Sequence, residues 1–210
     1  NFHRYVIDAN RDPSGASLYP GQNTTGLCPL TDFDGKKIYD RGCEPSAEDI
    51  AMRVGDWHAP YHTALLGEIE RVKKKHGAVI IYDCHSIRSV IPYLFDGQLP
   101  VFNVGTNGGT SCHPRIERQV NELAVSSPYS SVLNGRFRGG WTTRHYAQPA
   151  SGVHAIQMEI AQSAYLKLED RGERLHAAMD WWGNVTFAIG LIAVLVGITY
   201  GIQPYGTHAM

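Results

Sequence analysis

Three segments, far apart along the chain, each bring a chemically active side chain to an apolar run. Asn10 and Arg11 end the run RYVIDANR, His85 follows the run AVIIYDC, and Glu159 lies within HAIQMEI. Apolar runs of this length predict buried strands, and ligands in open α/β sheets gather at the carboxyl ends of strands. We therefore expect these four side chains to share one cleft.

His85 and Glu159 each allow two interpretations. An imidazole at the end of a strand can bind zinc through one ring nitrogen while the other donates a hydrogen bond, or it can be a structural histidine. A carboxylate between Met158 and Ile160 is costly to bury unless it is paired or bound to a ligand. Alternation along the strand could instead turn Glu159 to solvent.

Asn10 and Arg11 suit the recognition of a free carboxylate. A guanidinium binds a carboxylate through two parallel hydrogen bonds, and the Asn10 amide adds a donor. The alternative is an arginine that bridges the sheet end to the loop at 12–45. Arg4, earlier in the same run, is either a surface charge or a group that polarises a substrate carbonyl.

The elements that must position these groups follow from the hydrophobic pattern. Helices are expected from Ser46 to Gly77, interrupted at Pro60, and over 113–125. Strands are expected at 4–10, 78–83, 99–106, 131–137 and 154–160. The strand 78–83 has apolar residues on both faces, which is typical of a central parallel strand. Alternating strands and helices predict an α/β domain with a mainly parallel, mixed sheet.

Composition limits the function classes. The chain has 210 residues, 43% of them hydrophobic, and a net charge of −1. This length suits one domain with a sizeable core, and this charge gives no footprint for nucleic-acid binding. The four cysteines form no CxxC pair, which favours a reducing, cytoplasmic compartment.

The C-terminal part is a candidate membrane anchor. Residues 185–202 carry no charge over 18 residues, the lower bound for a bilayer-spanning helix. No Lys or Arg follows it, which would keep the preceding domain cytoplasmic. The alternative is a buried terminal helix. The expected organisation is a domain at 1–168, a linker at 169–184, a transmembrane helix at 185–202 and a tail at 203–210.

Several linked stretches together carry a family resemblance. They are RYVIDANRDPSGASLYPGQ, WHAPYHTALL, YDCHSIRSVIPYLFDGQLP, FNVGTNGGTSC and SSVLNGRFRGGWTTRHYAQPASGVHAIQMEIAQSAYL. Over residues 2–166 the chain resembles the N-formylglutamate amidohydrolase (N-formylglutamate deformylase) family, which is related to zinc carboxypeptidases and aspartoacylases. The resemblance implies a three-layer α/β/α fold. It also implies His85 as a ligand of zinc or another divalent metal, and Glu159 as general base.

The reaction implied by the resemblance is hydrolysis of N-formyl-L-glutamate, or a similar N-acyl amino acid, in histidine degradation. Asn10 and Arg11 would bind one substrate carboxylate, and Arg88 or Arg144 the other. Arg4 would help to stabilise the oxyanion of the tetrahedral intermediate.

The sequence also departs from this family. Relatives begin earlier, with a Pro-His-Ser-Gly motif that carries the first zinc histidine, followed by an acidic second ligand. Neither is present here, so we expect a chain truncated at its front, with an incomplete ligand set and weak zinc binding. His58 and His62 are expected in the core or behind the metal ligand. Two alternatives stay open: a membrane-anchored or transporter-derived fusion, and a carboxylate-binding module without turnover.

Overall fold

The computed structural model describes residues 3–166, nearly all within the compact unit Asn1–Ala164. The predicted linker at 169–184, membrane helix at 185–202 and tail at 203–210 lie outside the described residues, so those predictions stay predictions. Over residues 3–166, no helix combines the length and the apolar character that crossing a bilayer would require.

The described part of the chain forms one mixed four-stranded sheet. Its strands are β1 (Val79–Ile87), β2 (Phe102–Gly105), β3 (Ser131–Leu133) and β4 (Val153–Ala161). Their order is β1-β4-β2-β3. β1 runs parallel to β4 and β2 parallel to β3, whereas β2 and β4 are antiparallel. The α/β class with a mixed sheet is therefore confirmed.

The helical region after the first loop begins at Ser46, as predicted. Ser46 and Asp49 form a reciprocal capping box at the start of α1 (Ala47–Arg53). A π-helical turn (Val54–His58) then leads into α2 (Ala59–His76), with Pro60 in its first turn. The chain stays helical through Pro60, since His58 and Ala59 before it both have helical backbone angles. The predicted irregularity is therefore found as the π-helical turn just before Pro60, and not as a break at Pro60 itself.

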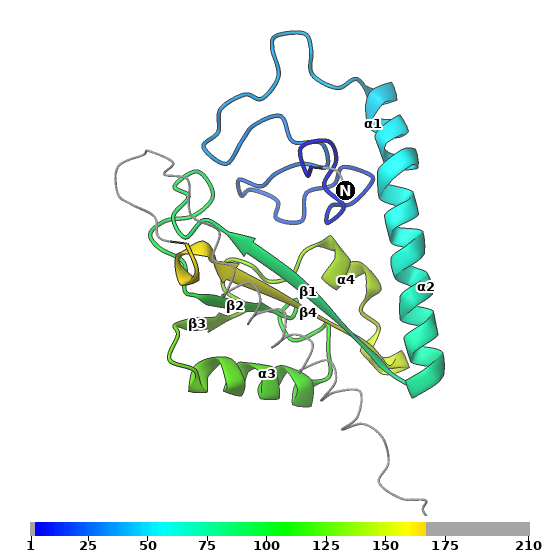
Figure 1. Ribbon diagram of the computed structural model, residues 1–210, viewed down its shortest axis with the longest axis vertical. Coiled ribbons are helices and arrows are strands. Elements are labelled where there is room, and N and C mark those ends of the chain that lie inside the picture. Colours follow the sequence, from blue (N-terminus) through cyan, green and yellow to red (C-terminus); the bar gives the residue numbers. More distant parts are fainter. Residues whose placement is uncertain (1–2, 167–210) are drawn as a thin grey trace, which may run out of the picture. The chain divides into compact units, whose positions relative to one another are not determined.

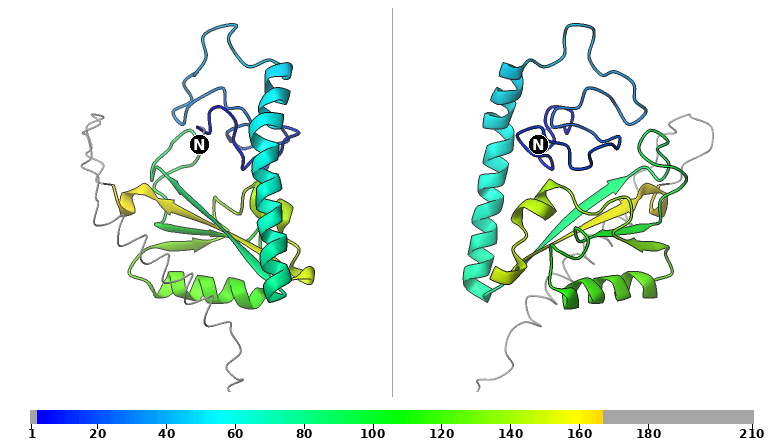
Figure 2. Two further views of the ribbon diagram at one scale, coloured as in Figure 1. Left: turned by 45° about the vertical axis from the view of Figure 1, so that its right-hand side comes forward. Right: turned by 180° about the vertical axis from the view of Figure 1, so that it is seen from behind.

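The remaining helices are shorter. They are α3 (Pro114–Ser126), α4 (Trp141–Tyr146) and two 3₁₀ turns (Pro149–Ser151 and Gln162–Ala164). α2 and α4 lie over one face of the sheet and α3 over the other, as Figure 1 shows and as the turned views of Figure 2 confirm.

Separate apolar clusters fill the two interfaces between helices and sheet. Ile69 of α2 packs with the first residues of β1 and β4, Val79 and Val153, and with Trp141 of α4. Across the sheet, α3 packs its apolar side on the alternate residues of β4. Because side chains alternate between faces, the two faces of β4 bury different sets of residues.

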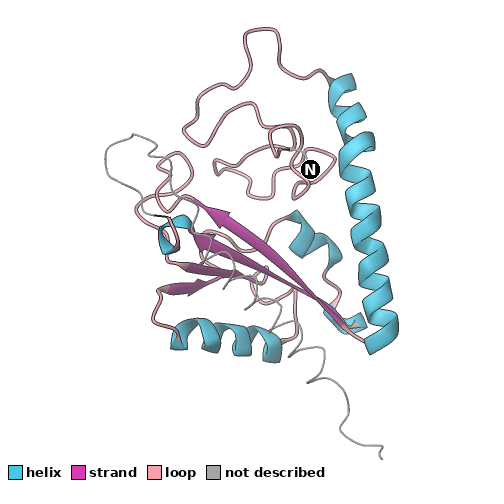
Figure 3. Cartoon of the chain, viewed as in Figure 1, coloured by secondary structure: helices cyan, strands magenta, loops and turns pink. Residues whose placement is uncertain are grey.

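The run 4–10 forms turns, so the predicted strand there is wrong. Asp8 N–H donates to the Leu27 carbonyl (2.7 Å), and the Asp8 carboxylate accepts hydrogen bonds from Arg4 (2.8 Å) and from Asn10 N–H (3.0 Å). Such local side-chain bonds compete with a strand ladder for the backbone donors. Residues 12–45 form the predicted loop, and Figure 3 shows this whole amino-terminal part as loop.

β1 also differs from expectation, because it lies at the sheet edge in the described residues and not at the centre. It continues four residues past the predicted strand 78–83, to Ile87. Ile80 and Tyr82 are about half exposed (48% and 46%). Apolar residues on both faces of a strand indicate that its faces are covered, but they do not predict whether a strand pairs with it on one side or on both.

Candidate active site

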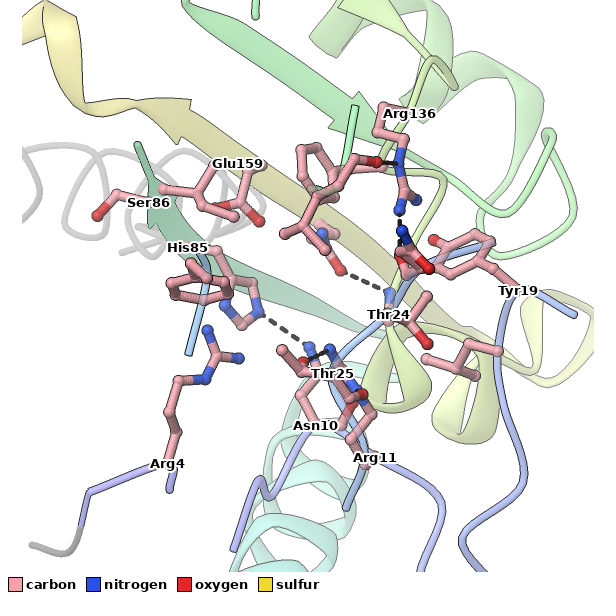
Figure 4. A pocket seen from close by; sticks show the side chains of 18 residues that line it. Arg4, Asn10, Arg11, Tyr19, Thr24, Thr25, His85, Ser86, Arg136 and Glu159 are labelled. Atoms are coloured by element: carbon pink, nitrogen blue, oxygen red, sulfur yellow. Dashed lines mark hydrogen bonds between the residues drawn. The ribbon is translucent and has the colours of Figure 1, made fainter. Parts of the chain in front are cut away.

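The site is built on the β1–β4 pair. His85 of β1 and Glu159 of β4 are register partners in this parallel pair, so their side chains leave the sheet on the same face. Asp83 lies two residues before His85, and the two-residue period of a strand places it on that face as well. Figure 4 shows His85 and Glu159 projecting toward one hollow.

Asp83 and Asn10 hold the His85 ring. His85 Nε2 lies 2.8 Å from Asp83 Oδ1 and 3.1 Å from Asn10 Nδ2, and Asn10 Nδ2 donates to Asp83 Oδ2 (3.2 Å). Burial lowers the pKa of His85, but the hydrogen bond to Asp83 and the charges of Asp83 and Glu159 outweigh it, so the net direction is upward. Asp83 and Glu159 therefore stabilise positive charge on the His85 ring more than burial opposes it.

Glu159 is deeply buried, with 6% of its surface exposed. Burial raises its pKa to about 7, against the opposing positive charges of His85, Arg4 and Arg11. A carboxylate with a pKa near neutrality can both accept and return a proton at physiological pH. That is the property required of a general base.

Arg11 is fixed by the loop around it. Its Nε donates to the Thr25 carbonyl (2.7 Å), its Nη2 to Thr25 Oγ1 (2.6 Å) and its Nη1 to the Asn10 carbonyl (2.7 Å). Burial lowers the pKa of Arg11, partly offset by the Asp8 carboxylate. These bonds use three of the five guanidinium N–H groups, which leaves donors for a ligand.

Two histidines of the α2 region hold the turn that carries Asn10 and Arg11. His58 Nε2 lies 2.9 Å from the Arg11 carbonyl, and His62 Nε2 lies 2.8 Å from the Ala9 carbonyl. A carbonyl can only accept, so both imidazoles carry their proton on Nε2. The prediction that these histidines lie in the core, behind the site, agrees with this placement.

A cavity of about 80 Å³ joins these groups. Five of the seven residues predicted for the site line it: Arg4, Asn10, Arg11, His85 and Glu159. The structure therefore brings together segments that are up to 155 residues apart in the sequence, and Figure 4 shows them around the hollow.

The other two predicted residues do not line this cavity. Arg88 forms an ion pair with Asp34 (2.7 Å), in which both side chains are largely exposed. Arg144 donates to the Gly139 and Leu18 carbonyls (2.9 and 3.1 Å) and lines a neighbouring cavity. Arg88 comes directly after the end of β1 at Ile87. The expected role of Arg88 in binding the second carboxylate is therefore not supported.

Arg136 and Gln157 are among the lining residues that sequence reasoning missed. Arg136 donates to the carbonyls of Leu94 and Asn23 (3.1 and 2.9 Å). Gln157 accepts from the Gly140 N–H (2.5 Å). The two-residue period of β4 predicts Gln157, because it lies two positions before Glu159 on the same face. No comparable period marks Arg136, which lies in a loop after β3.

Gly140 is required by its close approach to Asn10. A Cβ at position 140 would lie under 3 Å from the Asn10 amide group. The amide is also held by the next segment, since Asn10 Oδ1 accepts from Thr142 N–H (2.8 Å). The glycine therefore lets α4 and the Asn10 turn meet.

A zinc ion fits the described residues only in part. A catalytic zinc site takes about three protein ligands. Over residues 3–166, no group of three His, Cys, Asp or Glu side chains is arranged to hold a metal ion. His85 is a chemically suitable ligand, but its Nε2 is engaged by Asp83.

Comparison with known proteins identifies the family of the chain. The family model for N-formylglutamate amidohydrolase matches residues 1–166. N-formylglutamate deformylases from Pseudomonas aeruginosa and Pseudomonas putida are each 46% identical to the chain over 167 residues. The match covers 79% of this chain and 62% of each relative, so the chain spans less than two thirds of their length.

Two solved structures resemble the chain as well. The crystal structure of N-formylglutamate amidohydrolase from Ralstonia eutropha JMP134 matches with a TM-score of 0.62 and 26% identity, over 79% of this chain and 64% of that one. A gene product of Agrobacterium tumefaciens shares the fold, with a TM-score of 0.52 and 19% identity over 78% of this chain and 59% of that one. With the family model matching about four-fifths of its length, this chain belongs to the N-formylglutamate amidohydrolase family.

Proposed function

We propose that this chain carries the residues that bind and hydrolyse N-formyl-L-glutamate, a step of histidine degradation that yields formate and L-glutamate. The observation that supports this proposal most is the position of Glu159. It is a buried carboxylate with a pKa near 7, and it lines one cavity together with a guanidinium and an amide suited to a carboxylate.

The proposed steps use the groups of that cavity. Asn10 and the unused donors of Arg11 bind a carboxylate of the substrate. Glu159 takes a proton from a water molecule, whose oxygen attacks the formyl carbon. The carbon–nitrogen bond then breaks, Glu159 returns the proton to the leaving amine, and formate and glutamate are released.

Arg4 is the proposed partner of the developing oxyanion. Its Nη2 donates to Asp8 (2.8 Å), while its Nε is buried without a hydrogen-bond partner. An unpaired buried donor is costly, and Arg4 lines the cavity. A preorganised donor of this kind stabilises negative charge that develops on the substrate.

His85 is the one metal ligand that we propose among the described residues. Zinc or another divalent ion is what the family's relation to zinc carboxypeptidases suggests, and the three-layer fold is proposed on the same ground. Because the described residues make an incomplete ligand set, no step above is assigned to a metal. A cytoplasmic setting is proposed because all four cysteines are free thiols.

A second candidate is a module that binds glutamate without turnover. Two observations favour it. The side chains of Asn10 and Arg11 are held by hydrogen bonds to Thr142 and Thr25, whereas the described residues provide no complete set of metal ligands. Proposals that require membrane anchoring rest on residues 185–202, outside the described part.

Formate release tests the proposal directly. The chain is incubated with N-formyl-L-glutamate, with and without added zinc, and formate is measured by a coupled dehydrogenase assay. Release by the wild type that is lost in Glu159→Gln supports the proposed function. Calorimetric binding of glutamate that depends on Arg11, without any formate release, supports the binding module instead.

A further inference from the structure

A second cavity, of about 430 Å³, adjoins the first. The two share the side chains of Leu18, Tyr19 and Arg136, so these residues form the wall between them. The second cavity is further lined by Arg138 and Arg144. Among residues 3–166, no Asp or Glu lines this cavity.

Tyr19 holds two of the three guanidinium groups in place. The guanidinium carbon of Arg144 lies 4.8 Å from the centroid of the Tyr19 ring, and that of Arg136 lies 5.3 Å from it. The Tyr19 hydroxyl donates to the Gly139 carbonyl (3.2 Å) and accepts from the Arg138 N–H (3.3 Å). Cation–π contacts therefore gather positive charge around an uncharged ring.

The other contacts of these arginines leave their charges uncompensated. Within the described part of the chain, the hydrogen bonds of Arg144 and Arg136 all go to neutral backbone carbonyls. Within residues 3–166, neither of them and no part of Arg138 makes an ion pair with a carboxylate. Each guanidinium has five N–H groups, so Arg136 and Arg144 retain donors beyond these carbonyl bonds.

The like charges of Arg136 and Arg144, both gathered on the Tyr19 ring, repel one another, and an anion in the hollow would remove that cost. Guanidinium groups match the planar geometry of carboxylate and phosphate oxygens. We propose that this cavity is a second anion-binding site, which takes the carboxylate or phosphate group of a small anion independently of the Asn10–Arg11 turn. This site does not depend on the proposed hydrolytic function.

Calorimetric titration tests the site, with inorganic phosphate and acetate added separately at constant ionic strength. The proteins are the wild type, Arg144→Gln, Arg138→Gln and Arg11→Gln. A matched control is Arg118→Gln, on the exposed side of α3. Circular dichroism checks that each variant is folded.

We expect millimolar or tighter binding that weakens about tenfold in Arg144→Gln, weakens less in Arg138→Gln, and is unchanged in Arg118→Gln. Tighter binding of phosphate identifies a phosphate site, and tighter binding of acetate a carboxylate site; either supports the proposal. It is overturned if neither anion binds, or if binding is lost in Arg11→Gln but unaffected in Arg144→Gln. Formate release is measured separately, so that failure of the hydrolytic proposal is distinguishable.

Discussion

His85 and Glu159 are directly paired across the parallel strands β1 and β4. The charge of each affects the other: Glu159 raises the pKa of His85, and His85 opposes the upward shift of Glu159. Asp83, on the same strand as His85, also helps to raise both pKa values. A substitution at Asp83 is therefore expected to lower the pKa of both His85 and Glu159, and a substitution at His85 or Glu159 to shift the pKa of the other.

Replacing the proposed base should remove most of the activity. Glu159→Gln keeps the size of the side chain but cannot accept the proton, so kcat for formate release should fall about 10²- to 10⁴-fold. The control is Glu122→Gln, an exposed acid on α3. Undiminished turnover in Glu159→Gln would show that the general-base assignment is wrong.

Arg11→Lys should weaken substrate binding more than it slows the chemistry. Lysine keeps the charge but loses the two-pronged geometry of the guanidinium, together with the contacts to Thr25. We expect KM to rise about tenfold or more with a smaller change in kcat, measured by steady-state formate release. An unchanged KM would place the substrate carboxylate elsewhere, and Arg118→Lys is the control for nonspecific charge effects.

Gly140→Ala should displace Asn10. The new methyl group would lie under 3 Å from the Asn10 amide, and such overpacking costs about 1–3 kcal/mol. Chemical denaturation should show this loss, together with reduced glutamate binding. Gly67→Ala in α2 is the matched control, because nothing lies within 4 Å of its Cβ position and alanine there should stabilise the helix by about 0.5–1 kcal/mol. Equal stability of the two variants would contradict the close contact.

His62 should make folding sensitive to mild acid. Burial, together with the nearby His58 and His145, lowers the pKa of His62 to about 4 from an ordinary value of 6.5. Below about pH 6.5 His62 is therefore protonated in the unfolded chain, whereas in the folded chain it becomes protonated only near pH 4. Stability is lost across that window as the pH falls, by up to about 3 kcal/mol.

The comparison that isolates this effect is wild type against His62→Gln, each unfolded by urea at several pH values from 7 to about 4. Other groups titrate in the same range, and the raised pKa of Glu159 makes the folded protein more stable as the pH falls. The quantity to compare is therefore the difference in unfolding free energy between the two proteins at each pH. The difference should shrink as the pH falls, because the variant lacks the imidazole. A difference independent of pH would mean that His62 has the same pKa in the folded and unfolded protein, so that burial does not lower it.

The sequence predicted the local elements of the site better than their pairing. The apolar runs before His85 and around Glu159 predicted two strands, and the family motifs predicted their roles. Their register depends on backbone pairing between segments 74 residues apart, which no local pattern encodes. The turn at 4–10 was missed for a related reason. The Asp8 N–H donates to the Leu27 carbonyl and the Asp8 carboxylate accepts from the Asn10 N–H, so these two backbone donors are satisfied without a neighbouring strand.

The arginines show the same limit. Arg11 was predicted from an adjacent Asn-Arg pair, whereas Arg88 was placed by proximity in sequence to His85 and in fact contacts Asp34. Arg136 had no signal, because its place beside the cavity depends on the carbonyls of two other loops. Residues on strands follow a period, and residues on loops are placed by long-range contacts.

The π-helical turn Val54–His58 acts as a one-residue insertion in an otherwise continuous rod. Each α-helical residue turns the chain by about 100°, so deleting one residue here would swing α1 to another side of the axis. Arg53 donates to the Val6 carbonyl (2.8 Å), and after such a deletion this hydrogen bond would be lost. The extra residue thus sets which side of the helix Arg53 and His62 lie on. With it, Arg53 reaches the Val6 carbonyl and His62 reaches the Ala9 carbonyl from the same helical segment.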